Sequence, residues 1–236
     1  MNQLDERAEK QRRALDAGCG SERSYVDFGP DAYVVGIDIS ETELTLNEGL
    51  DERIVGDIQT YPLPAESFDE IACWDVLEHL PNPRQALVNL RNALKPGGKL
   101  TIGIPNLLSP KGMLTKFTPH WFHVWVYRRI FGFEAAGTPG YGPYRTYLRW
   151  VLAPRRLVGF MQEQGLIVEE VTLYESDFFE RFSEDRPVIG ALWSASGAVW
   201  RVVTLGKDPA PQVKLVARKP ALEPGASDPA PARLHA

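Results

Sequence analysis

Short apolar runs alternate with polar, turn-rich segments through the first half of the chain. The run 33-YVVGI-37 is β-branched and apolar, which is typical of a buried strand. Between Asn82 and Leu94, by contrast, apolar residues recur at the helical period and predict one apolar helix face. Strands that alternate with helices predict an α/β fold with a parallel sheet covered on both faces. We expect strands over 13–17, 33–37, 53–55, 68–74, 99–104, 166–174 and 212–218, and helices over 3–12, 82–94 and 154–164.

Capping residues support a further helix after the second strand. Ser40 is suited to cap its amino end, and Glu43 stands at the position that completes a capping box. The chain of 236 residues is long enough for one well-buried domain that carries insertions. We therefore predict a single domain over 1–219, with insertions over 106–160 and 175–210, followed by a Pro-, Ala- and Ser-rich tail over 220–236 that we expect to be disordered.

Composition and charge exclude several classes of protein. A net charge of −5 argues against a general nucleic-acid binder. Cys19 and Cys73 are too few for a disulfide framework and indicate a reducing compartment. The charged amino-terminal segment resembles no secretory signal, and no uncharged apolar run is long enough for a transmembrane helix. We expect a cytoplasmic protein.

A glycine turn follows the first predicted strand, in 14-ALDAGCGS-21. A strand that turns into a helix leaves backbone N–H groups pointing at whatever lies above it. Gly18 and Gly20 would let a ligand approach the main chain, because a Cβ there would collide with it. Taken alone, the turn is equally consistent with a plain tight connection between strand and helix.

Acidic residues at neighbouring strand ends favour a ligand. Asp38 ends the second strand, where an acid in a doubly wound fold hydrogen-bonds two ribose hydroxyls. Asp57 ends the third strand, where it could accept from an adenine amine. A dinucleotide site would usually have a third glycine, which is missing here. Asp16, just before the turn, would repel a diphosphate but suits an ammonium group. The ligand with ribose, adenine and a cationic amino-acid arm is S-adenosylmethionine.

The ordered motifs resemble those of the class I S-adenosylmethionine-dependent methyltransferases. The likeness runs from LDAGCG (15–20) through GIDIS (36–40) to the segment that starts GDIQ (56–59) and ends at Asn106. The resemblance implies a Rossmann-like, doubly wound, seven-stranded sheet whose last strand is antiparallel, with a lid-like insertion after the fifth strand. It also implies a cofactor-binding set of Asp16, Gly18, Cys19, Gly20, Asp38, Ile39, Asp57, Ile58 and Trp74.

Two features depart from the family pattern. Ser21 stands where a glycine is common. The segment between Gly20 and the second strand is short, so we expect the first helix to be stunted.

The segment 75-DVLEHL-80 follows the fourth strand, where a methyl acceptor would bind. The spacing i, i+3, i+4 allows Asp75, Glu78 and His79 to share one face of a turn. In one interpretation His79 is a general base. In a second, the three residues bind a divalent cation such as Mg²⁺, as the resemblance to ubiquinone-pathway O-methyltransferases suggests. In a third, Glu78 and His79 only order the loop.

The insertion over 106–160 is basic and aromatic. It carries twelve of the 24 aromatic residues, and eight basic residues against the single acid Glu134. It follows the fifth strand at the carboxyl edge of the sheet, where α/β folds bind ligands. We expect it to form an acceptor pocket in which arginines clamp an anionic or sugar-bearing acceptor. His120 and His123 are further candidates for base or ligand, although each could be a satisfied lid histidine.

The segment 188–203 has an apolar stripe of Val188, Leu192, Val199 and Val203. A helix packed on the domain, a second lid and a peripheral membrane contact all fit this pattern. The functional expectation is an O-methyltransferase for a small molecule, sugar or glycan in bacterial secondary-metabolite or surface-glycan biosynthesis. The alternatives are a lipid or quinone methyltransferase at a membrane surface, an N-methyltransferase, and a cofactor-binding partner subunit without catalysis.

Overall fold

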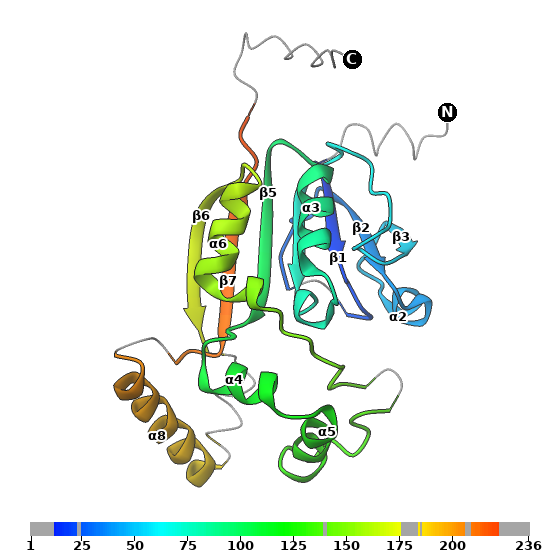
Figure 1. Ribbon diagram of the computed structural model, residues 1–236. Helices are drawn as coiled ribbons and strands as arrows, with labels where there is room; N and C mark the ends of the chain where they lie inside the picture. The colour runs from blue at the N-terminus through cyan, green and yellow to red at the C-terminus, as the bar shows by residue number, and fades with distance from the viewer. Residues whose placement is uncertain are drawn as a thin grey trace, which may run out of the picture.

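The computed structural model describes residues 12–22, 25–138, 141–175, 184, 186–205 and 209–221. The predicted helix over 3–12 lies outside these residues except for Arg12, which begins the first strand, and the predicted disordered tail lies outside them from residue 222. Every strand of the described residues belongs to one sheet of order β3-β2-β1-β4-β5-β7-β6 (Figure 1). The strands are β1 (Arg12–Ala17), β2 (Ala32–Asp38), β3 (Glu52–Val55), β4 (Phe68–Trp74), β5 (Leu94–Pro105), β6 (Ile167–Tyr174) and β7 (Gln212–Arg218).

The sheet confirms the predicted fold class. Strand β7 pairs antiparallel with both of its neighbours, whereas the other paired strands are parallel. The buried core is continuous along this sheet, from Leu15 and Ile37 at one side to Leu215 at the other. The helices and helical turns are α2 (Glu41–Leu46), η1 (Leu77–His79), α3 (Pro83–Ala93), α4 (Pro110–Phe117), α5 (His120–Arg129), η2 (Trp150–Leu152), α6 (Pro154–Glu163) and α8 (Pro187–Val203).

The helices fall into two groups. Helices α3 and α6 lie on one face of the sheet, whereas α4, α5 and α8 gather beyond its carboxyl edge (Figure 1). The basic, aromatic insertion therefore lies where the sequence placed it. No helix among the described residues is long and apolar enough to cross a membrane. Between β1 and β2 the described residues form no helix, in line with the expected stunted first helix.

Strand β5 is longer than predicted. The sequence 95-KPGG-98 was expected to separate helix from strand, but the strand already begins at Leu94. Long-range pairing is the reason, because Gly97 N donates to Lys219 O and Lys219 N donates to Gly98 O, each at 2.9 Å. The backbone of the glycine-containing segment is thus drawn into the sheet by a partner from the far end of the chain.

The capping of α2 is only half of the predicted box. Ser40 Oγ accepts from Glu43 N at 3.3 Å, as expected for an N-cap. The reciprocal bond is replaced, because Ser40 N donates to Asp38 Oδ1 and Glu43 Oε1 accepts from Tyr144 Oη. The acid of the predicted box instead ties α2 to the insertion.

We expect opposite effects from alanine at two glycines. At Gly103 a Cβ would lie 2.2 Å from the Trp74 ring, so Gly103→Ala should lower the free energy of unfolding by about 1–3 kcal/mol. At Gly159, inside α6, a Cβ would meet no atom within 4 Å, so Gly159→Ala should raise it by about 0.5–1 kcal/mol. Urea unfolding measures both variants, and a Gly103→Ala protein as stable as the wild type would contradict the packing described.

Candidate functional site

The glycine turn is held by a close approach of three strand ends. Gly18 N donates to Ile37 O at 2.7 Å, which joins the ends of β1 and β2. Gly18 has a φ of +79°, and a Cβ there would lie 2.3 Å from Val76 Cγ2, just beyond the end of β4. Residue 18 must therefore be glycine for two reasons, its left-handed backbone and the absence of space.

Asp38 lies beside this turn at the end of β2. Its Oδ2 accepts from Gly20 N at 3.0 Å and its Oδ1 accepts from Ser40 N at 2.9 Å. The carboxylate is thus fixed by two backbone N–H groups, and each oxygen retains a further lone pair for a ligand hydroxyl. Ile39 follows with 75% of its surface exposed, so an apolar side chain is available next to the carboxylate.

The remaining predicted cofactor residues differ in burial and in their hydrogen bonds. The carboxylate of Asp57 accepts from Gln59 N at 2.8 Å and from its side-chain amide, which fixes it at the end of β3. Ile58 is buried, so its side chain belongs to the core and only its backbone could border a ligand. Asp16 and Cys19 are also buried, and desolvation together with Asp16 raises the pKa of the Cys19 thiol to about 12. Cys19 is therefore a neutral packing residue.

Trp74 packs against Tyr25, a residue that the sequence did not mark as a candidate. The Trp74 ring packs over Gly103 and stacks on Tyr25, with ring centroids 5.8 Å apart and an interplanar angle of 16°. Tyr25 also lines a cavity of about 310 Å³ beside the glycine turn, and of the predicted cofactor residues only Asp16 lines that cavity. Tyr25 lies in the short segment that replaces the first helix.

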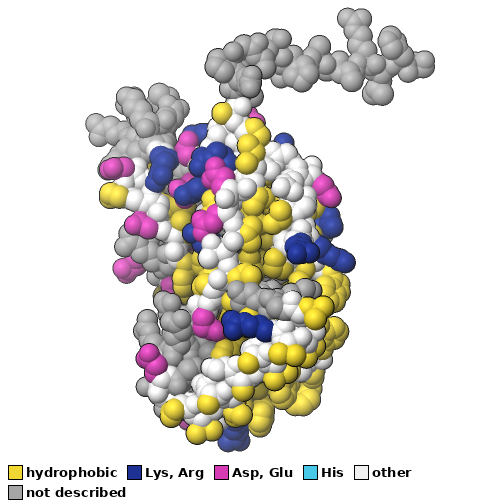
Figure 2. All heavy atoms as spheres, turned by 90° about the vertical axis from the view of Figure 1, so that its left-hand side faces the viewer, with side chains coloured by type: hydrophobic (Ala, Val, Ile, Leu, Met, Phe, Trp, Pro, Cys, Tyr) yellow, Lys and Arg dark blue, Asp and Glu magenta, His cyan; other side chains and the backbone are white. Residues whose placement is uncertain are grey.

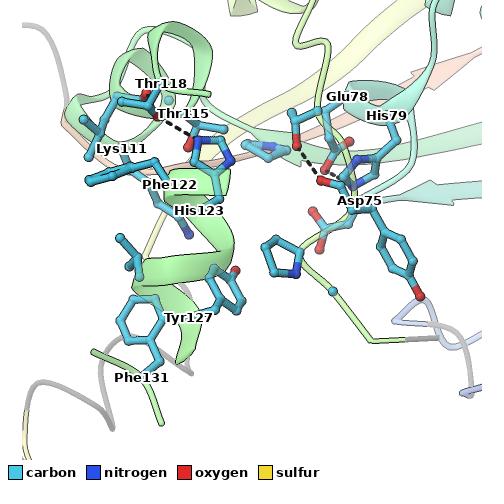
Figure 3. Close-up of a pocket in the computed structure, with 18 of the residues that line it drawn as sticks. Asp75, Glu78, His79, Lys111, Thr115, Thr118, Phe122, His123, Tyr127 and Phe131 are labelled. Atoms are coloured by element: carbon cyan, nitrogen blue, oxygen red, sulfur yellow. Dashed lines mark hydrogen bonds and ion pairs between the residues drawn. The ribbon is translucent and has the colours of Figure 1, made fainter. Parts of the chain in front are cut away.

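A larger cavity of about 430 Å³ lies between the carboxyl edge of the sheet and the insertion (Figure 3). Its apolar walls come mainly from α4, α5 and the segment 142–146, with Trp193 from α8. The charged and ionisable side chains that face it include Asp75, Glu78, His79, Lys111, His123 and Tyr127. Figure 3 shows the first three on the side of the sheet and the other three across the cavity on α4 and α5.

Asp75, Glu78 and His79 occupy distinct environments. Asp75 has a φ of +53° and lines the cavity, whereas Glu78 is buried with 3% of its surface exposed. Among the described residues Glu78 Oε2 has no hydrogen-bond partner. His79 Nδ1 lies 3.0 Å from Arg145 O, which can only accept, so this nitrogen carries the proton. His79 Nε2 is then the basic nitrogen, and it lies 3.9 Å from Glu78 Oε1.

These environments shift the titration of all three groups. Desolvation raises the pKa of Asp75 to about 6, and the nearby Lys111 ammonium opposes this shift. Desolvation, and then the charge of Asp75, raise the pKa of Glu78 well above its ordinary value. Desolvation lowers the pKa of His79, against the hydrogen bond to Arg145. At neutral pH this arrangement favours a neutral imidazole and an ionised Asp75 beside it.

The metal interpretation receives no support from this geometry. Asp75 precedes η1 in a left-handed conformation, so the three residues do not lie on one regular helical turn, although all three line the cavity. Within the described parts of the chain, no group of three or more His, Cys, Asp or Glu side chains could hold a metal ion.

The insertion contains one histidine on the cavity and one outside it. His123 lines the cavity, and its Nε2 lies 2.7 Å from Thr118 Oγ1. His120 is exposed at the start of α5 and does not line the cavity, so the prediction that it serves the site is not supported.

The expected arginine clamp is wrong. Of the eight basic residues of the insertion, only Lys111 lines the cavity. Arg145 and Arg149 instead lie over the outer Tyr147 ring, and Arg128 Nε donates to Ala136 O. Lys116 Nζ donates to Leu148 O and lies over the Trp150 ring. These four basic side chains contact other parts of the insertion. The lining of the cavity is mainly apolar.

Three residues of the site were not predicted individually from the sequence. Lys111 was counted only as one basic residue among eight, and Tyr127 and Tyr144 only as aromatic residues of the insertion. Desolvation lowers the pKa of Lys111, while Asp75, Glu175 and Glu78 raise it. Lys111 lies in a stretch for which the sequence predicted no helix or strand, so nothing indicated that its side chain would turn inward.

Comparison with known proteins agrees with the fold and the glycine turn. A family model described as "Methyltransferase domain" matches residues 15–102. A ubiquinone biosynthesis O-methyltransferase of Coxiella burnetii is 25% identical over 69% of this chain and 67% of that protein. An uncharacterized 37.1 kDa protein in transposon TN4556 of Streptomyces fradiae is 38% identical over 39% of this chain, but this covers only 30% of that protein.

A solved structure extends the likeness to most of the chain. The S-adenosylmethionine-dependent methyltransferase of Archaeoglobus fulgidus aligns with a TM-score of 0.51 at 17% identity, covering 92% of this chain and 90% of that one. At this identity the likeness concerns the fold. The family match spans the glycine turn and both acid-bearing strand ends. Residues 15–102 thus match a methyltransferase domain, and the chain has the fold of the class I S-adenosylmethionine-dependent methyltransferases.

Proposed function

We propose that the protein transfers the methyl group of S-adenosylmethionine to a hydroxyl oxygen of a small molecule with an apolar, ring-containing body. The observation that carries this proposal is the 430 Å³ cavity, which combines apolar and aromatic walls with ionisable groups beside the end of β4. Pockets of this size and character take small ligands that a few polar groups orient. An anionic acceptor, which the sequence analysis expected, would find one lysine and no arginine among the described residues that line this cavity.

The name of one relative supports an oxygen as the acceptor atom. The relative of Coxiella burnetii carries the name of a ubiquinone biosynthesis O-methyltransferase. Its likeness to this chain covers about two thirds of each protein, so the acceptor is carried over only as a chemical class.

The residues present fit the cofactor. Asp38 offers a fixed carboxylate to a ribose, and Ile39 offers an exposed apolar side chain beside it. At Gly20 a Cβ would meet only Glu43 Oε2, so the main chain is accessible there, whereas Gly18 packs against Val76. Asp16 lies two residues before Gly18 on β1. When bound, S-adenosylmethionine supplies a sulfonium methyl group that is open to displacement by a nucleophilic oxygen.

The contribution of the protein is to orient the acceptor and to accept its proton. Methyl transfer requires the oxygen and the methyl group to be held in line, which is mainly positioning. The hydroxyl proton needs an acceptor that is unprotonated at neutral pH. Asp75 suits this task because its carboxylate faces the cavity, while His79 donates through Nδ1 to Arg145 O and directs Nε2 towards Glu78. Lys111, across the cavity, would stabilise negative charge that develops on the oxygen.

Cofactor binding should depend on Asp38. Asp38→Ala should weaken the binding of S-adenosylhomocysteine at least about tenfold, because charge-assisted hydrogen bonds to the ribose are lost. Glu41→Ala, an exposed acid in the first turn of α2, is the matched control and should leave the affinity unchanged. Titration calorimetry measures both, and an Asp38→Ala protein of wild-type affinity would remove Asp38 from the cofactor site.

Two variants rank the proton acceptors. Asp75→Asn should lower kcat/KM by about a hundredfold or more, because it removes the base and retains the shape. His79→Gln should lower it by less than about tenfold if the imidazole only supports the loop. Release of S-adenosylhomocysteine with a panel of phenolic acceptors provides the measurement. The reverse ranking would assign the base to His79, and two unaffected variants would exclude general-base catalysis by this cluster.

The pH profile should follow Asp75. A base works in its ionised form, so kcat/KM should rise with pH and reach half of its plateau near pH 6, the raised pKa of this carboxyl. Lys111 lowers the pKa of Asp75, so Lys111→Met should move the midpoint to higher pH. A profile that is flat from pH 5 to 8, or a midpoint that moves to lower pH in Lys111→Met, would contradict the assignment.

A further inference from the structure

Helix α8 does not bury the apolar stripe that its sequence shows. Val188, Leu192, Val199 and Val203 expose 73, 67, 61 and 71% of their surfaces. Of the three interpretations that the sequence left open for this stripe, packing against the domain is therefore wrong. The helix instead turns Trp193 towards the cavity, where its Nε1 donates to Glu175 Oε2 at 3.2 Å. One side of α8 serves the cavity and the other faces outwards.

Neighbouring helices of the insertion extend this outward apolar surface. Phe117 at the end of α4 exposes 68% of its surface, and Trp121 and Trp125 on α5 expose 69 and 49%. The helices lie together at one end of the molecule (Figure 1), and Arg186 Nη1 at the start of α8 donates to Ile130 O after α5 at 2.6 Å. Figure 2 shows hydrophobic side chains gathered over the lower part of the face that carries α8.

The charges of these helices have one sign. Helices α4, α5 and α8 contain the basic residues Lys111, Lys116, Arg128, Arg129 and Arg201 and no acidic residue. The whole chain, by contrast, has a net charge of −5. The acid that contacts α8, Glu175, lies outside the three helices, as do Glu134 and Glu184. Exposed tryptophans and valines beside arginines are the composition of a helix that lies in a membrane interface.

We propose that α4, α5 and α8 form a docking surface for an anionic lipid bilayer. The apolar side chains enter the boundary of headgroups and acyl chains, and Arg128, Arg129 and Arg201 meet the lipid phosphates. A bilayer suits the surface better than a single protein groove, because the exposed apolar groups are spread over separate helices. The apolar surface also continues inwards, since Leu114 is both 57% exposed and part of the cavity wall.

Vesicle binding tests this surface without any need for turnover. The full chain should sediment with vesicles of phosphatidylcholine and phosphatidylglycerol, and less with phosphatidylcholine alone. The double variant Leu192→Glu/Val199→Glu should lower the partition coefficient at least about tenfold. Ile167→Glu is the matched control, because Ile167 is 56% exposed at the start of β6, at the opposite end of the sheet. S-adenosylhomocysteine binding and thermal unfolding report whether each variant is folded.

Several outcomes would overturn the proposal. These are a wild-type protein that stays in solution with both vesicles, equal binding to neutral and anionic vesicles, and a double variant that binds like the wild type. A further one is a wild-type dimer that the double variant dissociates, since the face would then join two copies of this chain. If the double variant does not fold, the tryptophan fluorescence of the wild-type protein is measured with vesicles of brominated lipids. Docking predicts quenching of this fluorescence, and unchanged fluorescence would contradict the proposal.

Discussion

The site depends on the absence of a side chain at Gly18. A Cβ at this position would lie 2.3 Å from Val76 Cγ2, and its N–H is already bonded to Ile37 O at 2.7 Å. These two contacts bring the ends of β1, β2 and β4 to one point. Because strands of a parallel sheet end at the same edge, this point fixes Asp38 on one side and Asp75 on the other. The proposed donor and acceptor positions are therefore neighbours because the strand ends meet at this glycine.

The sequence predicted correctly those elements whose structure depends on neighbouring residues. The strand over 68–74, the cap at Ser40 and the glycine turn follow from residues that are close in sequence, and each was found as expected. Long-range pairing decided the rest. The early start of β5 depends on Lys219, and the burial of Glu78 depends on an insertion some seventy residues later. Charge and spacing do not determine whether a side chain of an irregular segment points into a cavity or into solvent. The direction of the arginines in the insertion therefore could not be predicted from the sequence.

Burial of the acids beside the cavity works against stability. An acid whose pKa is higher in the folded than in the unfolded protein destabilises the fold as pH rises between these two values. For Asp75 this interval runs from about 4 to about 6, so its penalty is complete at neutral pH. Glu78 adds a buried carboxyl whose Oε2 has no hydrogen-bond partner among the described residues. Groups that cost stability in this way are concentrated at functional sites, which supports the placement of the chemistry here.

The segment 141–148 couples the two halves of the site. Tyr144 Oη donates to Glu43 Oε1 at 2.9 Å, on the helix that follows Asp38. A few residues later, Tyr147 N and Leu148 N donate to Glu78 O at 2.8 and 3.0 Å, next to the proposed acceptor. One stretch of backbone is thus anchored both beside the cofactor strand and beside the cavity. Because the segment that replaces the first helix is short, this insertion covers the site, and its anchors at Glu43 and Glu78 join the cofactor side to the cavity.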